Sequence, residues 1–504
     1  MELLRSISLS GNTTAPNAST CVSTKPTLTP SPKPISNTPK CLALSTLFGP
    51  LVSFPGTPTY QASLDSYFTQ QNAHLQPYCI LTPTSPEEIS TALTTLTSIP
   101  NCPIAIRSGG HAYTPGASNI ASGITLSLQN LNSTTVSSDH TIASIGAGAT
   151  WGEVYAHLDP LNLSVSGGRA AQVGVGGLTT GGGISYFSPR YGWTCDSAVN
   201  FEVVLANGTI VNANEDENAE LLFALRGGSN NFGVVTRVDM KAFEQGPVWG
   251  GSVYHDVSTV DEQVKAFVDL NSAEEYDEYA SLITSFGFAG GKGAAVVNSL
   301  EYTRAEENPE VFRGFMEIPR VHSTMRIAGM HEIAVEQGSF SPDGNRQLGV
   351  VTTHGSTVSM LKAVYQRWNA SLAAVQDVPG IVWSISLEPL PPAIYARGSS
   401  TNAMGLDDIS GSLVVTLLSA TWSDEVDDAK VEKAARELFE NIEDDACKLD
   451  VYESFVYLNY AAPWQDPIAS YKSKSIENLK RVSQDVDPKG VFRVNVPGGF
   501  KLPD

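Results

Sequence analysis

The sequence predicts an α+β fold with two unlike parts. Residues 40–245 alternate short apolar runs with short helical segments and are dense in glycine. From about Trp249, long alternating runs are interspersed with longer amphipathic segments, which is typical of an antiparallel sheet covered by helices. With 504 residues, 41% of them hydrophobic, the chain can build two substantial cores.

Composition divides the chain into four predicted segments. Residues 1–39 are rich in Ser, Thr, Pro and Asn and contain no apolar block of the kind that a secretory signal carries, so we predict a disordered tail. Residues 40–245 and 246–450 are the predicted domains, and residues 451–504 are predicted to return to the first. Localisation stays open, because N-x-S/T sequons permit secretion without showing it.

The first domain is predicted to open with a β-α-β unit. A strand near Tyr78 leads to Ser85, which is placed as the N-cap of a helix to about Ser98. Pro103–Ile106 follows as the second strand. Further elements are expected as strands at 123–128 and Ile142–Gly146, helices at Trp151–Leu158 and Glu220–Leu225, and a hairpin at Phe201–Val211 that turns at Asn207-Gly208.

The second domain is predicted from apolar periodicity. Helices are expected at Val260–Leu270, Val358–Val375 and Asp424–Ile442, and strands at Ser281–Phe288, Ala294–Tyr302, Met325–Val335, Ile381–Leu387 and Leu413–Leu418. The tail is expected to form a strand at Ser454–Tyr460 and a helix at Ile468–Val486.

Charge and cysteine usage exclude several classes of protein. The formal net charge is −21, so phosphate backbones would repel the chain and no nucleic acid is expected as a partner. No apolar stretch approaches the roughly 18 residues of a membrane helix, which indicates a soluble protein. The six cysteines form no C-x-x-C pair, so no metal site is predicted. We expect a monomer.

His111 ends the run Pro103-Ile-Ala-Ile-Arg-Ser-Gly-Gly-His111, which predicts a buried strand, a sharp glycine turn and an imidazole at its lip. Glycine in such a turn lets backbone N–H groups approach a ligand and cradle a phosphate. The alternative is a loop histidine that caps its own backbone.

The glycines between Gly167 and Gly183 are too dense for an ordinary apolar block, since each one inside an element costs roughly 0.5–1 kcal/mol relative to alanine. They predict a groove where backbone lies against a large flat ligand that carries phosphates. Their spacing fits neither G-x-G-x-x-G nor a Walker A loop. Loops and bulges of an ordinary β domain are the alternative.

Several ordered blocks together resemble a known family. They are Arg107–His111, Gly174–Gly183, Tyr191–Asp196, Val203–Gly208 and Leu225–Gly233. In this order they resemble the FAD domain of berberine-bridge-enzyme-like oxidoreductases, a PCMH-type branch of the vanillyl-alcohol-oxidase superfamily. Residues Phe455–Tyr460 and Asp487–Phe492 look like that family's C-terminus. The resemblance runs from about residue 40 to the end and is strongest to fungal members.

The resemblance implies a PCMH-type domain in which two subdomains, within residues 73–245, hold FAD in a cleft roofed by the second domain's sheet. His111 matches the position that bonds covalently to the flavin. Alanine stands at position 170 where many relatives carry a second, cysteinyl tether, so attachment through His111 only is predicted. The predicted cofactor-binding residues are Arg107, Ser108, Gly109, Gly110, His111, Ser118, Asn119, Val173, Gly174, Gly176, Gly177, Gly181, Gly182, Gly183 and Val235.

The activity that the resemblance implies is removal of a hydride from a small organic substrate, plausibly in secondary metabolism, with O2 as the acceptor and H2O2 as the product. Val173 matches a position that influences O2 access, unless it is simply part of the core. The alternatives are a flavoprotein cyclase that couples oxidation to ring formation, and a flavin-fold binding protein without turnover.

Three residues are candidates for the catalytic base. In Val382–Glu388, strand alternation puts Ser384, Ser386 and Glu388 on one face, and this face looks toward the flavin if the apolar face packs under helices. In the predicted strand Phe455–Tyr460, Tyr457 and Asn459 share a face. A structural hydrogen bond is the alternative for Glu388, Tyr457 and Asn459 alike. The resemblance also implies a disulfide between Cys41 and Cys102.

Overall fold

The computed structural model describes residues 39–99, 102–272 and 274–503. Apart from Pro39, the predicted disordered tail 1–39 lies outside the described residues. The described chain folds into three β-sheets, of four, six and nine strands. The described helices and mostly antiparallel strands confirm the predicted α+β class.

The four-stranded sheet has the order β1-β2-β4-β3. Its strands are β1 (Val52–Ser53), β2 (Cys79–Leu81), β3 (Ile104–Arg107) and β4 (Ile124–Ser127). Both β2 and β3 pair parallel with β4, so the strands of the predicted β-α-β unit are separated by β4. Ser85 caps the intervening helix α5 (Pro86–Thr97) as predicted, because its hydroxyl accepts a hydrogen bond from the Glu88 N–H at 3.3 Å.

The six-stranded sheet supplies the second layer. Its strands are β5 (Thr134–Val136), β6 (Ile142–Gly146), β7 (Leu163–Val165), β8 (Ala198–Val204), β9 (Ile210–Ala213) and β10 (Val234–Glu244). The predicted hairpin at Asn207-Gly208 joins β8 to β9, with Gly208 at φ +84°. The helices of this part are α6 (Trp151–Leu158), α7 (Val175–Thr180), α8 (Ser188–Tyr191) and α9 (Ala219–Leu225).

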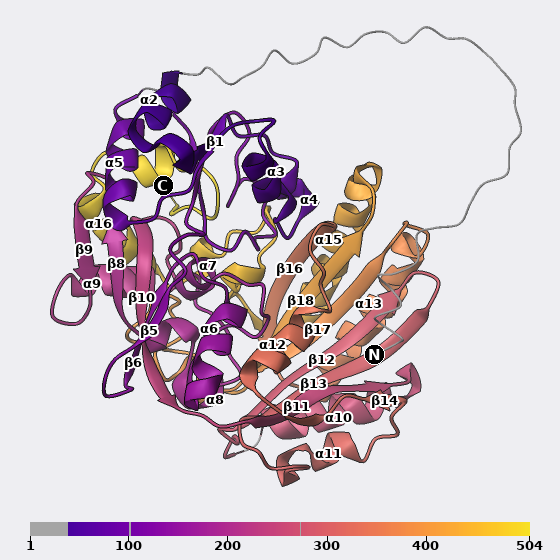
Figure 1. Ribbon diagram of the computed structural model, residues 1–504. Coiled ribbons are helices and arrows are strands. Elements are labelled where there is room, and N and C mark those ends of the chain that lie inside the picture. Colours follow the sequence, from indigo (N-terminus) through magenta and orange to yellow (C-terminus); the bar gives the residue numbers. More distant parts are fainter. Residues whose placement is uncertain (1–38, 100–101, 273, 504) are drawn as a thin grey trace, which may run out of the picture.

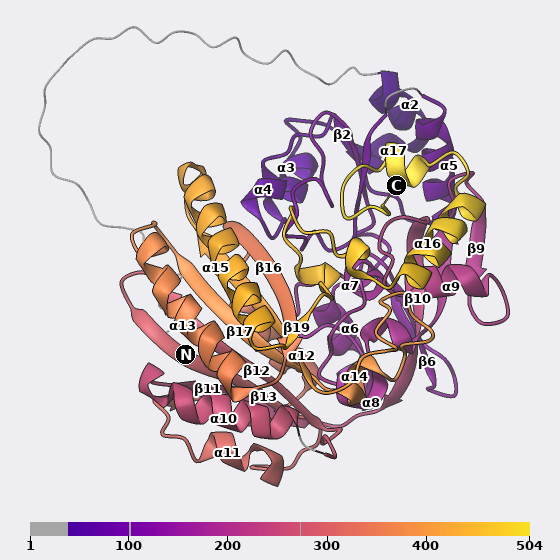
Figure 2. The same cartoon turned by 180° about the vertical axis from the view of Figure 1, so that it is seen from behind.

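The nine-stranded sheet is antiparallel throughout. It contains β11 (Val248–His255), β12 (Ala280–Ala289), β13 (Gly293–Tyr302), β14 (His322–Ser323), β15 (Arg326–Ala328), β16 (Arg346–Gly355), β17 (Val382–Leu390), β18 (Leu413–Trp422) and β19 (Tyr452–Glu453). Helices α10 (Val260–Asn271), α13 (Val358–Val375) and α15 (Asp428–Lys448) cross its outer face (Figure 2). Trp383, Ile385 and Leu387 of β17 are buried in the core on that side.

The C-terminal segment runs back to the first two sheets (Figure 1). Helix α16 (Ser473–Val486) packs on α9, and α17 (Val491–Val494) leads to Asn495, whose carbonyl accepts from the Ile104 N–H of β3 at 2.6 Å. The remaining helices are α2 (Pro39–Phe48), α3 (Pro58–Asp65), α4 (Gln70–Ala73), α11 (Arg313–Met316), α12 (Met330–Gly338) and α14 (Pro392–Tyr395).

The structure corrects two predicted strands. Met325–Val335 is the short strand β15 followed by α12, because the residues after Gly329 bury the helical set Met330, Ile333 and Ala334. Phe455–Tyr460 forms no strand, since Leu458–Tyr460 is a 3-10 turn. The sequence prediction also missed β11 and β16.

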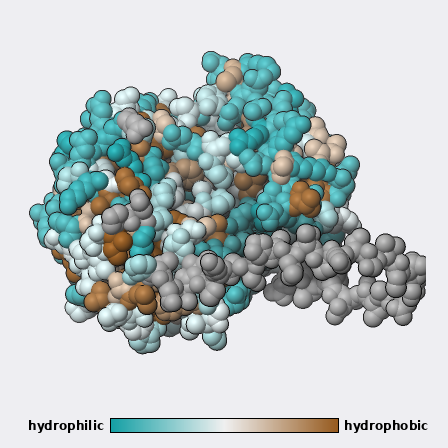
Figure 3. Space-filling model, turned by 90° about the horizontal axis from the view of Figure 1, so that it is seen from above, coloured by the Kyte–Doolittle hydropathy of each residue, from teal (hydrophilic) through white to brown (hydrophobic). Residues whose placement is uncertain are grey.

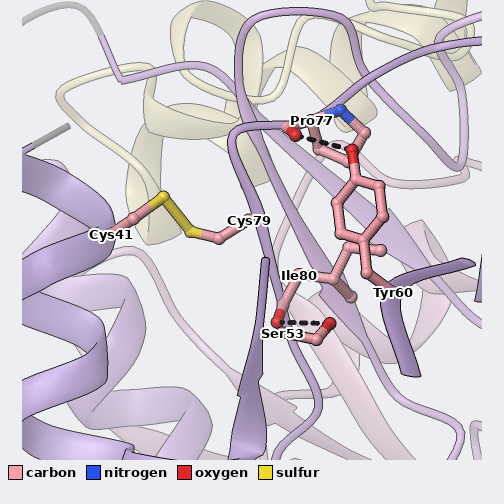
Figure 4. The surroundings of a disulfide bond; sticks show 6 residues. All are labelled: Cys41, Ser53, Tyr60, Pro77, Cys79 and Ile80. Carbon is pink, nitrogen blue, oxygen red and sulfur yellow. Dashed lines mark hydrogen bonds between the residues drawn. A yellow bond between two sulfur atoms is a disulfide. The ribbon is translucent and has the colours of Figure 1, made fainter. Parts of the chain in front are cut away.

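The described cysteines pair differently from the expected Cys41–Cys102 bond. Cys41 of α2 is bonded to Cys79 of β2 (Figure 4). Cys102 is a buried free thiol. Helix α2 packs against β1 and α5, next to β2. Cys102 precedes β3, which lies beyond β4 in the sheet, so Cys79 is the cysteine within reach.

None of the described helices is long and apolar enough to cross a membrane. Seen from above, hydrophobic residues lie in separate patches among polar ones (Figure 3).

Cys41→Ser should lower the free energy of unfolding by about 2–5 kcal/mol, because it opens a covalent loop. Cys102→Ser is the matched control and should change stability much less. Denaturant unfolding measures both. Peptide mapping without reduction should recover Cys41 linked to Cys79, and a Cys41–Cys102 peptide would contradict the structure.

Candidate functional site

A cavity of about 490 Å³ lies between the inner face of the nine-stranded sheet and the loops of the other two sheets. Its walls come from three separate parts of the chain. The first wall contains Ser108, Gly109, Gly110, His111, Ser118, Val173, Gly174, Gly176, Gly177 and Val235; the sheet contributes Ser285, Gly287, Ser384, Ser386, Glu388 and Ser419; and the C-terminal segment contributes Tyr457, Asn459 and Tyr460.

Two glycine segments touch each other in the first wall. A Cβ atom on Gly109 would lie 2.7 Å from the Cα of Gly174, and one on Gly174 would lie 2.4 Å from the Gly109 nitrogen. Neither position can carry a side chain without moving backbone. The wall is therefore bare main chain, as the glycine density predicts.

His111 lies at the end of this wall, with its ring stacked on Phe68 at a centroid distance of 3.8 Å. Gly110, just before it, has φ +77° and makes the turn after β3. Burial lowers the pKa of His111 to about 4. The imidazole is thus neutral near pH 7 and keeps a ring nitrogen lone pair free for bonding.

Five predicted cofactor residues do not line the cavity: Arg107, Asn119 and the three glycines Gly181, Gly182 and Gly183. The guanidinium of Arg107 donates to the carbonyl oxygens of Ser63 and Ser66, at 2.6 and 2.9 Å, and lies over the Tyr67 ring. Asn119 donates to backbone carbonyls of Asn72 and Leu75. Through these hydrogen bonds, both side chains stabilise the loops that form the cavity wall.

The Gly181–Gly183 turn also lies outside the cavity, where it holds two predicted catalytic residues. The Gly183 N–H donates to the Tyr457 hydroxyl at 3.0 Å, and Asn459 Nδ2 donates to the same hydroxyl at 3.0 Å. A Cβ atom on Gly181 would lie 2.1 Å from Asn459 Oδ1. Burial raises the pKa of Tyr457. Tyr457 and Asn459 reach the cavity, but their polar atoms are bonded within the wall.

Glu388 takes part in a buried ionic cluster. Its carboxylate pairs with Arg169 at 2.7 Å and accepts a hydrogen bond from the Tyr460 hydroxyl at 3.1 Å, while Arg169 donates to that hydroxyl at 2.6 Å. Burial alone would lower the pKa of Arg169, but the Glu388 carboxylate and the Tyr460 phenol raise it above its ordinary value. Burial raises the pKa of Tyr460.

The sequence prediction missed Arg169 and Tyr460. Arg169 directly precedes the Ala170 position, which could have drawn attention to it. Tyr460 ends the block Phe455–Tyr460 that resembles the family's C-terminus, but a strand would have placed its side chain on the face opposite Tyr457. The 3-10 turn at Leu458–Tyr460 brings both rings to the cavity, at a centroid distance of 4.8 Å.

The floor of the cavity is a row of small residues across neighbouring strands. Strand register aligns Ala295, Gly287, Ser384, Ser419 and Gly349. The next row contains Ser285 and Ser386, whose hydroxyls lie 2.8 Å apart. The polar atoms of these two rows are hydroxyl groups, and Val297 and Leu417 line the cavity beside Ser285 and Ser386. The predicted inward face of Ser384, Ser386 and Glu388 is confirmed.

Comparison with known proteins identifies the family. Residues 77–214 match the FAD binding domain family model. The FAD-dependent monooxygenase CTB5 of Cercospora nicotianae is 36% identical over 87% of this chain and 100% of its own length. The chain belongs to the same family as this relative, the FAD-linked oxidoreductases. A protein of Diaporthe leptostromiformis named Oligopeptidase PhomG' is 42% identical to this FAD-linked oxidoreductase over 90% of the chain, which spans only 36% of that relative's length.

Solved structures show the same fold. The 6-hydroxy-D-nicotine oxidase of Arthrobacter nicotinovorans aligns over 90% of this chain and 99% of its own, at 19% identity and a TM-score of 0.74. The glucooligosaccharide oxidase of Acremonium strictum, with a 6-S-cysteinyl, 8α-N1-histidyl FAD, aligns over 93% and 98%, at 19% identity and a TM-score of 0.74.

The residues present fit FAD. The bare glycine wall has the close-approach backbone that a pyrophosphate needs. The Ser118 hydroxyl lines the cavity, is buried, and has no hydrogen-bond partner among the described residues, so it is open to a polar group of the cofactor.

Arg169→Met should lower the free energy of unfolding by about 3–5 kcal/mol near neutral pH, because it leaves the Glu388 carboxylate buried and unpaired. Urea unfolding of the wild type and the variant at neutral pH measures the difference. The control combines Arg169→Met with Glu388→Gln, which removes both charges and should recover most of the loss. A double variant that loses as much stability as the single variant would contradict the ion pair.

Proposed function

We propose that the protein is an FAD-dependent oxidase of secondary metabolism that removes a hydride from a small organic substrate. The observation that carries the proposal is the Tyr460–Glu388 hydrogen bond in the cavity that His111 and the glycine wall also line. His111 and the glycine wall would hold FAD there, and the cofactor would supply the acceptor for the hydride and the route by which two electrons reach O2 to give H2O2.

The chain's own residues supply position and a proton acceptor. Tyr460 is the group proposed to take the proton from the substrate's O–H or N–H and to pass its own proton to Glu388, along the 3.1 Å hydrogen bond. Arg169 positions both groups. Tyr457 and Asn459 act as positioning residues, because their polar atoms already bond to Gly183 and to the Leu178 carbonyl.

FAD is proposed to be held covalently by His111 alone. The low pKa keeps the imidazole neutral, as bond formation to the flavin requires. Ala170 lies in the same cavity wall and offers no sulfur for a second bond.

Monooxygenation is a second candidate, because relatives such as CTB5 are named FAD-dependent monooxygenases. Oxidation to H2O2 leaves no atom of O2 in the product, whereas monooxygenation leaves one, reduces the other to water and takes two electrons from a reductant such as a reduced nicotinamide. The enzyme should be supplied with alcohols, phenols, sugars and amines, anaerobically to follow flavin bleaching, and then under labelled O2 with and without a reduced nicotinamide. Bleaching followed by one H2O2 per unlabelled product supports the oxidase, and absence of bleaching by every class contradicts it. Labelled product that depends on the reduced nicotinamide supports the second candidate, and absence of labelled product from every class contradicts that one.

Tyr460→Phe should slow flavin reduction by the best compound of that panel about 10²- to 10⁴-fold, because the proton acceptor is lost. Tyr457→Phe is the matched control: it removes the same atom from a neighbouring buried ring and should have a much smaller effect. Stopped-flow absorbance measures both rates. A larger effect of Tyr457→Phe would transfer the role to Tyr457.

Denatured wild-type protein should keep its FAD, with the flavin mapped to the His111 peptide alone. His111→Ala should release all FAD on acid precipitation, because no other residue is proposed to bond to it. Intact-protein mass spectrometry measures the tether without any need for turnover. Free FAD from the wild type, or flavin on a second peptide, would contradict the single tether.

A further inference from the structure

A hydrogen-bonded chain of three side chains runs from the cavity into the protein. Ser299 of β13 and Gln337 of α12 line the cavity, and Glu301 follows Ser299 on the same face of β13. The Ser299 hydroxyl lies 2.7 Å from Glu301 Oε1 and 2.9 Å from Gln337 Oε1.

The Ser299 hydroxyl has one hydrogen for two oxygen neighbours. Both contacts are satisfied if Glu301 is protonated, since it then donates to Ser299, which donates to Gln337 Oε1. If Glu301 is ionised, Ser299 must donate to the carboxylate, and the Gln337 amide must turn over to donate to Ser299. The two states present opposite ends of the Gln337 amide to the cavity.

Burial favours the protonated state. Glu301 is 1% exposed, and its Oε2 atom has no hydrogen-bond partner among the described residues. The titratable groups that face it are Arg169, Tyr186 and Glu336. Arg169 is bonded to Glu388, so an ionised Glu301 would be a buried charge without an ion-pair partner.

Burial is the largest effect on the pKa of Glu301, and the charges around it act in opposite directions. Burial raises the pKa of Glu301 to about 8; Ser299 and Arg169 oppose the rise, and Glu336 adds to it. Glu336 itself is held by Arg326 at 2.5 Å.

We propose that Glu301 is protonated in the working enzyme and that its proton sets the direction of the chain through Ser299, so that Gln337 offers its amide N–H to a substrate oxygen. Glu301 and Ser299 are positioning residues, and Gln337 is the recognition residue. In this state Gln337 Nε2 has no hydrogen-bond partner among the described residues and remains available.

The proposal names a substrate class and rests on the proposed function in taking this cavity as the substrate site. The matching group is an uncharged carbonyl or phenolic oxygen, which accepts a hydrogen bond. Among the described residues the cavity offers an ammonium group no free carboxylate, because Glu301 is neutral and Glu388 is paired with Arg169. Together with the hydroxyl groups of the floor, these features favour an uncharged oxygenated molecule over an amine.

Infrared spectroscopy of the holoenzyme tests the proton directly. Wild-type protein should show the carbonyl band of a neutral carboxylic acid below pH 8, and the band should disappear above pH 8. Glu301→Gln should remove it at every pH. Absence of a band that Glu301→Gln removes would overturn the proposal, and this measurement needs no substrate.

Calorimetric titration of the holoenzyme with acetophenone tests recognition, with ethylbenzene as the control that lacks the oxygen. Acetophenone should bind the wild type about three- to tenfold more weakly above pH 8 than below it, because one hydrogen bond is lost. Ethylbenzene should show no such change.

Two variants distinguish the hydrogen-bonded chain Glu301–Ser299–Gln337 from other causes of a pH-dependent affinity. Glu301→Gln should bind acetophenone equally well at both pH values, because a carboxamide donates to Ser299 without titrating. Gln337→Met should bind acetophenone no better than ethylbenzene. The same pH dependence in Glu301→Gln as in the wild type would overturn the proposal. Both titrations are independent of turnover, so failure of the flavin-bleaching panel would contradict the proposed function and leave this result standing.

Discussion

The buried ion pair between Arg169 and Glu388 determines how the rest of the site is arranged. Two charges removed from water are stable only if they pair with each other and their remaining polar atoms form hydrogen bonds. The Tyr460 hydroxyl meets the second condition, because it accepts a hydrogen bond from Arg169 and donates one to Glu388. The pair joins the loop after β7, the strand β17 and the C-terminal segment. These three parts cannot shift independently without leaving a buried charge unpaired, so the walls of the cavity keep a defined separation.

The cavity itself exists because side chains are missing on both of its faces. Gly109 and Gly174 bring two backbone segments into contact on the first wall. Small residues aligned across β13, β12, β17, β18 and β16 leave one row of short side chains on the sheet face. Chemical groups are placed at the margins of this space: His111 on the first wall, the Glu388 cluster between the walls, and the Ser299–Gln337 pair where α12 meets the sheet. This is an arrangement suited to a planar cofactor and a small substrate held between two surfaces.

Local sequence signals predicted much of the fold. Helix α13 begins and ends at the predicted residues, Ser85 caps α5, and β17 shows its predicted two faces, because capping and apolar periodicity act over a few residues. Two segments were wrong for a shared reason. Met325–Val335 and Phe455–Tyr460 have strand-like composition, but the first packs as a helix against α6, and the second turns so that Tyr457 and Tyr460 both reach the cavity.

By itself, the sequence determined the α+β class, the glycine wall, the position of His111 at the edge of that wall, and the family. Each of these follows from a pattern of residues that are contiguous in the sequence. Only the tertiary structure decided which residues meet. Arg169 contacts Glu388 and Tyr460 across 219 and 291 positions of sequence, and Cys41 pairs with Cys79 because β4 separates β2 from β3. The proposed protonation of Glu301 likewise depends on its burial and on the number of hydrogen-bond donors around Ser299. Burial and long-range pairing are properties of the packed chain, and no local pattern encodes them.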